Sequence, residues 1–233
     1  MRRGLVAAAF AVGVALAGTV LAPGTAGAVD NFTCQGGFSN PPASGTYTNV
    51  IVPSTANGTN FCYLNGATVQ RNVTVQPGGA VLIANTTIGR SVTSTSAGTG
   101  AGGQFFSVAM CGSTVGRNVS VSGSSSLVEI GTDDYGNNCV GTIRQNTLNG
   151  NTDITNNQGG VEVEGNQVNG NLSVNRNSGA LSNYSRDFDA GPNVTTAVNN
   201  NSDSTHHLSC SGNAGVVDST NNTFKTVTGQ CRR

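Results

Sequence analysis

Tryptophan is absent from the sequence, aromatic residues make up 5% of it, and only 9% of its 233 residues are charged. Few large apolar side chains are therefore available to offset the entropy lost on folding, and such a composition is by itself typical of disorder. Lysine and arginine together number 11, as do aspartate and glutamate, so the chain has no excess of positive charge. This balance argues against nucleic acid as a partner.

Long apolar runs are missing beyond the first 28 residues. That opening stretch combines Arg2 and Arg3 with an apolar run and ends in Ala-Gly-Ala before Val29, which is the layout of a cleavable secretory signal. No later run approaches the roughly 20 apolar residues that span a bilayer. We therefore expect residues 1–28 to be removed and residues 29–233 to form one exported domain that does not span a membrane.

Six cysteines follow the predicted signal, an even number that is typical of disulfides in an oxidising compartment. No two of them have the C-x-x-C spacing of a zinc site, and the only histidines are His206 and His207, so we expect no metal and no cofactor. Their order along the chain suggests sequential pairs, with the outer two pairs closing the ends of the domain. The predicted pairs are Cys34 with Cys62, Cys111 with Cys139, and Cys210 with Cys231.

A repeated pattern of Val, Ile and Leu argues against disorder. Counted from the first apolar residue of each unit, these residues recur at offsets zero, four, six and thirteen, with a single substitution by Thr152. Partial or full units start at 46, 69, 88, 115, 148 and 168. The four full sets are Val69, Val73, Val75, Leu82; Val115, Val119, Val121, Val128; Leu148, Thr152, Ile154, Val161; and Val168, Leu172, Val174, Leu181.

Offsets four and six lie on the same side of a strand, so each unit contains short strands with one apolar side. A unit of about 20 residues cannot bury that side alone, and neighbouring units must stack. The sequence thus predicts an all-β fold, a single-stranded parallel β-helix or β-solenoid of about seven to nine coils. We expect regular coils over about 46–183 and irregular coils or a cap over 184–233.

Asparagine recurs at offset three, where a side-chain amide at a corner of the coil can bond the coils above and below. This position also suits the left-handed backbone conformation that asparagine tolerates. Glycosylation is the alternative interpretation, since several of these residues lie in N-x-S/T sequons. The offset-three residues are Asn49, Asn72, Asn118, Asn151 and Asn171, with Ser91 as the exception.

The apolar repeat with asparagine at its turns resembles the secreted parallel β-helix repeat proteins, over about residues 46–181. Polysaccharide lyases and hydrolases of that class imply carbohydrate as a substrate class. Their acidic catalytic clusters have no counterpart here that can be matched residue by residue.

Two stretched spacings, after Ser94 and after Ile130, predict loops that leave the rod at one corner. The second contains Asp133 and Asp134, whose oxygens could bind Ca²⁺, although no known loop spacing supports this over a solvated turn. Acidic residues also recur at offset fourteen of consecutive units. These are Glu129 and Glu162, which together with Glu164 predict an outward, solvated acidic patch; a catalytic carboxylate pair is the alternative.

Two further polar segments are weaker candidates. His206 and His207 lack a placed nucleophile or carboxylate partner, so the sequence gives them no catalytic role. Residues 186–191, Arg-Asp-Phe-Asp-Ala-Gly, suggest a local salt bridge in a loop.

Arginine recurs at offset two in three successive units, as Arg71, Arg90 and Arg117, whereas the next two units have Gly150 and Gly170 there. Stacked coils would place the three guanidinium groups in a column. One interpretation is that they extend into water; the other is that they bind the phosphates or carboxylates of a polyanion.

These features favour a secreted, non-catalytic β-solenoid that acts as a structural or adhesive protein of the cell envelope or extracellular matrix. Extracellular polysaccharide or polyanion is the expected partner, and the sequence leaves the oligomeric state open. A carbohydrate-active enzyme on the same fold is the main alternative. An ice-binding surface is less favoured, because the outward offset-five residues include Asp153.

Overall fold

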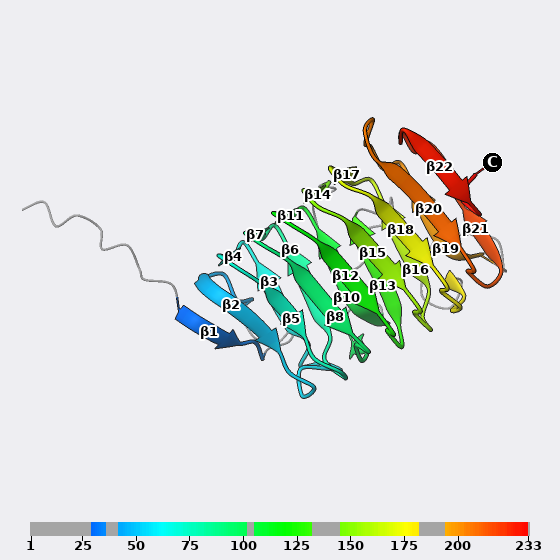
Figure 1. Cartoon of the computed structure of the whole chain (residues 1–233). Coiled ribbons are helices and arrows are strands. Elements are labelled where there is room, and N and C mark those ends of the chain that lie inside the picture. Colours follow the sequence, from blue (N-terminus) through cyan, green and yellow to red (C-terminus); the bar gives the residue numbers. More distant parts are fainter. Residues whose placement is uncertain (1–28, 36–41, 102–104, 132–144, 182–193, 233) are drawn as a thin grey trace, which may run out of the picture.

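The computed structural model describes residues 29–35, 42–101, 105–131, 145–181 and 194–232. Its strands stack into a parallel β-solenoid of about seven coils, with β1 (Val29–Thr33) at one end and β22 (Thr226–Gly229) at the other (Figure 1). The predicted fold class is therefore confirmed. The predicted signal, residues 1–28, lies outside the described residues.

The strands form three columns along the rod, in two sheets. Columns one and two belong to one sheet, because β2 pairs with both β4 and β5, and column three is the second sheet. Column one consists of β4 (Thr68–Val69), β7 (Thr87–Ile88), β11 (Thr114–Val115), β14 (Thr147–Leu148) and β17 (Gln167–Val168).

Column two is the longest. It consists of β2 (Thr46–Val52), β5 (Val73–Val75), β8 (Val92–Thr95), β12 (Val119–Ser122), β15 (Thr152–Thr155), β18 (Leu172–Asn175), β20 (His207–Ser211) and β22, with β1 paired to β2. Column three consists of β3 (Cys62–Asn65), β6 (Val81–Ala84), β10 (Phe105–Cys111), β13 (Leu127–Gly131), β16 (Val161–Glu164), β19 (Val194–Asn199) and β21 (Val216–Asp218). Of the strands in the described ranges, β9 (Gly100–Ala101) alone pairs antiparallel, with β10.

The apolar repeat fills the interior in the predicted register. Val121 is fully buried, and its partners on the neighbouring strands are Ser94 and Ile154. The partial unit at Ile88 therefore forms a complete coil, with Ser94 taking an interior position where its neighbours have Val or Ile. Residues at offsets zero, four and six of the four full units are all buried.

The predicted interior position at offset thirteen is correct in two of the four full units, Val128 and Val161, and wrong in the other two. The interior residue of β6 is Val81, whereas Leu82 lies on the opposite side of the sheet in a second apolar cluster with Phe61, Phe106 and Leu127. Leu181 also belongs to that outer cluster, and the strand partner of Val161 in the next coil is Thr196. Turn length varies between columns two and three, so a fixed offset across that turn fails.

The coils differ in length because insertions leave the rod between strands. The backbone of Ser91 bonds Asn72, 19 residues earlier, while equivalent bonds link Asn118 to Asn151 across 33 residues and Asn171 to His207 across 36. The insertion after β8 joins column two to column three, whereas the one after β13 joins column three to column one. The expectation that both insertions share one corner is therefore wrong. After the third insertion, β19 to β22 continue the same parallel pairing.

Two buried asparagine ladders run up corners of the rod, in columns other than offset three. At each rung the amide Nδ2 donates to the Oδ1 of the next residue, as from Asn166 to Asn201 at 2.9 Å. The residues just before them, such as Asn156 and Asn200, have positive φ and make the corner. The ladders are Asn146, Asn166, Asn201, Asn222 and Asn157, Asn177, Asn213. The amide ladder is thus present, but the left-handed conformation at offset three is not.

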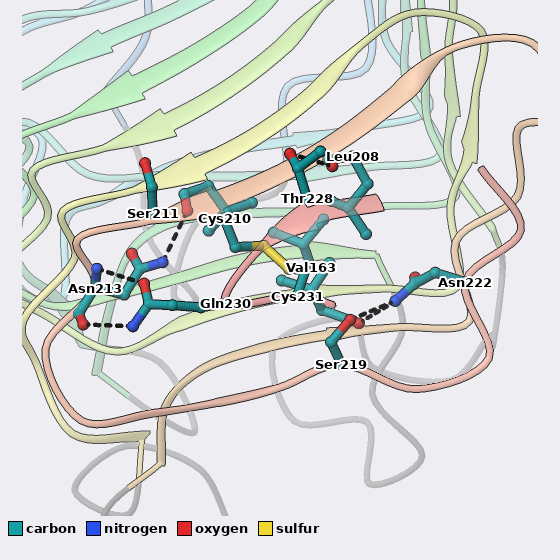
Figure 2. The surroundings of a disulfide bond; sticks show 12 residues. Val163, Leu208, Cys210, Ser211, Asn213, Ser219, Asn222, Thr228, Gln230 and Cys231 are labelled. Carbon is teal, nitrogen blue, oxygen red and sulfur yellow. Dashed lines mark hydrogen bonds between the residues drawn. A yellow bond between two sulfur atoms is a disulfide. The ribbon is translucent and has the colours of Figure 1, made fainter. Parts of the chain in front are cut away.

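Disulfides close the apolar interior at both ends. Cys34 bonds Cys62 with a Cα separation of 5.5 Å. Cys210 bonds Cys231 with a Cα separation of 5.3 Å (Figure 2), and both values are near the usual separation. All four are buried in the core. Cys111 is also disulfide-bonded, and its predicted partner Cys139 lies outside the described residues. Such bonds indicate an oxidising compartment.

A charge placed in the interior tests the register. Val121→Asp would bury a carboxylate between Ser94 and Ile154 and should lower the free energy of unfolding by about 3 kcal/mol or more. Thr93→Asp, on the exposed side of β8 beside Thr74 and Ser120, should cost less than about 1 kcal/mol. Equal losses in denaturant titrations would contradict the register.

The C-terminal disulfide should hold the last coil in place. Replacing Cys210 and Cys231 together by alanine should lower the free energy of unfolding by about 2–4 kcal/mol. Hydrogen exchange should speed up first at the amides of β22, which has only β20 as a neighbour. Unchanged protection of β22 would show that side-chain packing alone fixes this end.

Candidate anion-binding edge

The three recurring arginines lie on one line along the rod. The backbone N–H of Arg90 donates to the carbonyl of Arg71, and that of Arg117 donates to the carbonyl of Arg90, both at 2.9 Å. All three are exposed. Within the described ranges, no carboxylate oxygen lies within 4.0 Å of their guanidinium nitrogens. We call Arg71, Arg90 and Arg117 the arginine edge.

The edge lies at the bend between columns one and two, and glycine allows the chain to make it. Ile88 and Val92 both point inward, so the three residues between them must turn the corner. A Cβ at Gly89 would collide with the carbonyl oxygen of Gln70, and a Cβ at Gly116 with that of Gly89. The Gly-Arg pairs thus combine close backbone stacking with an outward cation.

The offset-three asparagines run beside the edge and fix its spacing. Here the side-chain Oδ1 accepts from the backbone N–H of the next coil: Asn72 from Ser91 at 3.3 Å, and Asn118 from Asn151 at 3.1 Å. Ser91 has no amide to continue this series. These bonds to Oδ1 hold the backbone of successive coils in register beside the arginines.

A column of threonine hydroxyls lies on the other side of the bend and was missed in the sequence. Thr68, Thr87 and Thr114 each directly precede an inward residue of column one, a position that lies before offset zero and outside the predicted pattern. Thr68, Thr87 and Thr114 are exposed. The paired residues in order are Thr46, Thr68, Thr87, Thr114 and Thr147. They provide neutral hydrogen-bonding groups next to the arginine edge.

The acidic residues do not form the predicted solvated patch. Glu129 and Glu162 are cross-strand partners that point away from the core, as their offset implied, but each is only 3% exposed. Glu164 is half-buried and accepts a hydrogen bond from Asn199 Nδ2. Alternation along a strand predicts which side a residue faces, and not whether other segments cover that side.

Some candidates cannot be placed. Asp133, Asp134 and residues 186–191 lie outside the described residues. Among the described residues, no group of three His, Cys, Asp or Glu side chains is arranged to hold a metal ion. None of the described segments forms a helix long and apolar enough to cross a bilayer.

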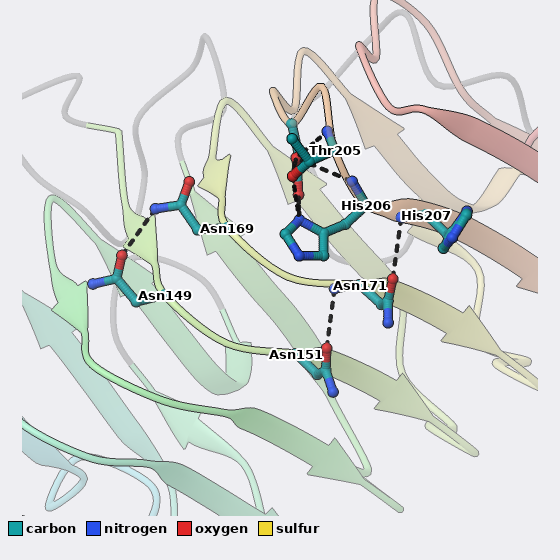
Figure 3. A network of polar contacts seen from close by, with 8 residues as sticks. Asn149, Asn151, Asn169, Asn171, Thr205, His206 and His207 are labelled. Atoms are coloured by element: carbon teal, nitrogen blue, oxygen red, sulfur yellow. Dashed lines mark hydrogen bonds and ion pairs between the residues drawn. The ribbon is translucent and has the colours of Figure 1, made fainter.

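His206 belongs to a local polar turn (Figure 3). Its Nδ1 lies 2.6 Å from Asp203 Oδ2 and 2.7 Å from Thr205 Oγ1. Burial favours a raised pKa for Asp203, but hydrogen bonds from Thr205 and His206 outweigh it and hold that pKa below the usual 3.8. A Ser-His-Asp type triad uses opposite ring nitrogens for the carboxylate and the nucleophile, whereas here both partners share Nδ1. This turn is therefore not arranged for nucleophilic catalysis.

Comparisons with known proteins find no significant match to this chain among family models, curated proteins or solved structures. The class of protein is therefore defined by the fold, a disulfide-closed parallel β-solenoid with asparagine ladders.

The glycines of the edge should matter for stability, whereas the arginines should not. Gly116→Ala would drive a Cβ into the Gly89 carbonyl and should lower the free energy of unfolding by about 1–3 kcal/mol. Arg117→Ala, one residue on, should change it by less than about 0.5 kcal/mol. Thermal and denaturant unfolding of the two variants would check this, and a silent Gly116→Ala would contradict the close approach.

Proposed function

We propose that this chain is a secreted, non-catalytic β-solenoid of the cell envelope or extracellular matrix that binds a linear polyanion through the arginine edge. The observation that carries the proposal is the placement of Arg71, Arg90 and Arg117 on consecutive hydrogen-bonded coils, exposed and without a carboxylate nearby among the described residues.

The three arginines of the edge lie close enough together to interact electrostatically. Adjacent coils lie about 4.8 Å apart, well inside the Debye length of about 8 Å at physiological ionic strength. Three like charges at this spacing repel one another unless an anion lies between them. In a chain with only 11 lysines and arginines, three on one line concentrate the positive charge.

The shape of the edge favours a polymer as its ligand. Guanidinium groups bind carboxylates and phosphates through paired N–H donors, and the column repeats this group along the rod axis. The flanking hydroxyls of Thr68, Thr87 and Thr114 can bond neutral sugar hydroxyls on one side. Carboxylate-bearing and phosphate-bearing envelope polymers share the required chemistry.

The alternative, a carbohydrate-active enzyme, depends on Glu129 and Glu162. The two residues are neighbours in register, which favours a carboxylate pair, but their burial argues against access to a polysaccharide chain. Release of reducing ends from the polymers below would overturn the non-catalytic part of the proposal.

Binding should depend on the arginines and on salt. We expect the protein lacking residues 1–28 to bind polygalacturonate or poly(glycerol phosphate), with affinity that falls steeply as salt is added. The triple alanine variant of Arg71, Arg90 and Arg117 should lose about tenfold or more in affinity while its melting temperature stays unchanged. Isothermal titration with both polymers separates the carboxylate from the phosphate source.

Two control variants sharpen this test. Replacing all three arginines by lysine keeps the charge but not the paired donors, and should restore only part of the affinity. Replacing the exposed Arg176 and Arg232 by glutamine removes charge elsewhere and should leave binding nearly intact. Salt-insensitive binding, or a triple alanine variant that binds as well as the parent, would leave the edge as an ordinary solvated surface.

A further inference from the structure

The line of residues that contains the arginine edge continues beyond it to the last coil. After Arg117 the line passes through Gly150 and then Gly170. These residues stack directly, since a Cβ on Gly150 would meet the backbone of Arg117 and a Cβ on Gly170 would meet the carbonyl of Gly150. The next coil contributes His206, since Asn171 and His207 are hydrogen-bonded neighbours. The last position is Lys225, whose N–H donates to the His206 carbonyl at 3.0 Å.

The end of this line is a second basic group, which we call the distal contact (His206 and Lys225). Lys225 is exposed, and the His206 side chain is 41% exposed. Among the described residues their charged neighbour is Asp203, which is bonded to His206 in its own turn. The facing positions of the preceding coil are Asn169, Gly170 and Asn171, of which Figure 3 shows the two asparagines.

The carboxylate of Asp203 is turned away from the surface that a ligand would meet. Its side chain is 4% exposed, and its oxygens accept hydrogen bonds from Thr205 and from the backbone of His206. The exposed groups of the distal contact are therefore the ammonium of Lys225 and the imidazole of His206.

The arginine edge and the distal contact are too far apart to reinforce each other electrostatically without a ligand. Three coil steps separate Arg117 from His206, which is about 14 Å at the usual strand spacing. This exceeds the Debye length of about 8 Å at physiological salt, so neither group reinforces the field of the other. Only a ligand long enough to touch both can couple them.

Among the described residues, the positions of the line between the two groups are uncharged and are flanked by amides. Gly150 and Gly170 lack side chains, and exposed asparagines flank them on both sides. Asn169 Nδ2 donates to Asn149 Oδ1 at 2.9 Å on one side, and Asn171 N–H donates to Asn151 Oδ1 at 3.0 Å on the other (Figure 3). A polymer crossing this stretch meets neutral hydrogen-bonding groups rather than opposing charge.

We propose that His206 and Lys225 form a second anion contact for the same linear polyanion, which lies lengthwise along the rod from Arg71 to Lys225. This inference rests on the proposed function. It assigns the ligand a direction, along the rod axis and across the strands, and a minimum length of about 29 Å for six coil steps. Binding at both ends of one chain raises affinity through effective concentration.

Chain length tests the second contact. The probes are two fractions of oligogalacturonides, one too short to reach from Arg117 to His206 and one long enough to reach from Arg71 to Lys225. The long fraction should bind the parent protein about tenfold more tightly than the short one, because only the long chains can touch both groups at once.

Two variants report on the contact itself. Lys225→Ala alone, and together with His206→Gln, should abolish the gain for the long fraction and leave short-fraction affinity unchanged. Arg232→Ala, which removes an exposed charge off the line, should keep the gain. Melting temperatures check the fold, and Lys225→Ala suffices should the double variant unfold.

The outcomes separate the two proposals. Arginine-dependent binding of short chains, with no gain for long chains or a gain that survives Lys225→Ala, would overturn the second contact and leave the arginine edge in place. Absence of any binding by either fraction and by poly(glycerol phosphate) would overturn both.

Discussion

Hydrogen bonding between parallel strands of successive coils is the interaction on which the rest of the structure depends. Each coil lies one strand spacing above the last, so every position of the repeat becomes a column of like residues. Interior columns become a continuous apolar core, as for Val69, Ile88 and Val115. A surface column becomes a line of one chemical type where the repeat keeps one residue, as for Arg71, Arg90 and Arg117. A short sequence repeat is thereby converted into long-range order, with an interior built mainly from Val, Ile and Leu.

At the corners of each coil, backbone polar groups lack partners on neighbouring strands. A chain that turns three times per coil leaves backbone groups unpaired at each bend, and buried polar groups need partners. Asn157 and Asn177 meet this need from inside: each amide bonds a backbone carbonyl of another coil as well as the next amide of the ladder. Asn72 and Asn118 do so from outside, through the backbone N–H of the next coil.

Much of this could be predicted from the sequence, for a physical reason. Alternation within a strand has a fixed period, so Val119 and Val121 had to share the inner side, and a residue such as Arg117 had to stack on its equivalent in the previous coil. What failed lies across turns of variable length. Leu82 was misplaced by one residue, and the distal line of His206 and Lys225 was invisible because a long insertion precedes it. The burial of Glu129 likewise depends on packing outside the repeat.

The coil that runs from Asn151 to Asn171 closes after 20 residues with no insertion. It is joined to the coil before it and to the coil after it by the same type of bond, from a backbone N–H to the Oδ1 of an asparagine. Duplicating or deleting this coil would lengthen or shorten the rod by one coil step and would leave every column in phase. The spacing between charged groups on such a rod can therefore change by whole coils during evolution, while the chemistry of each group stays the same.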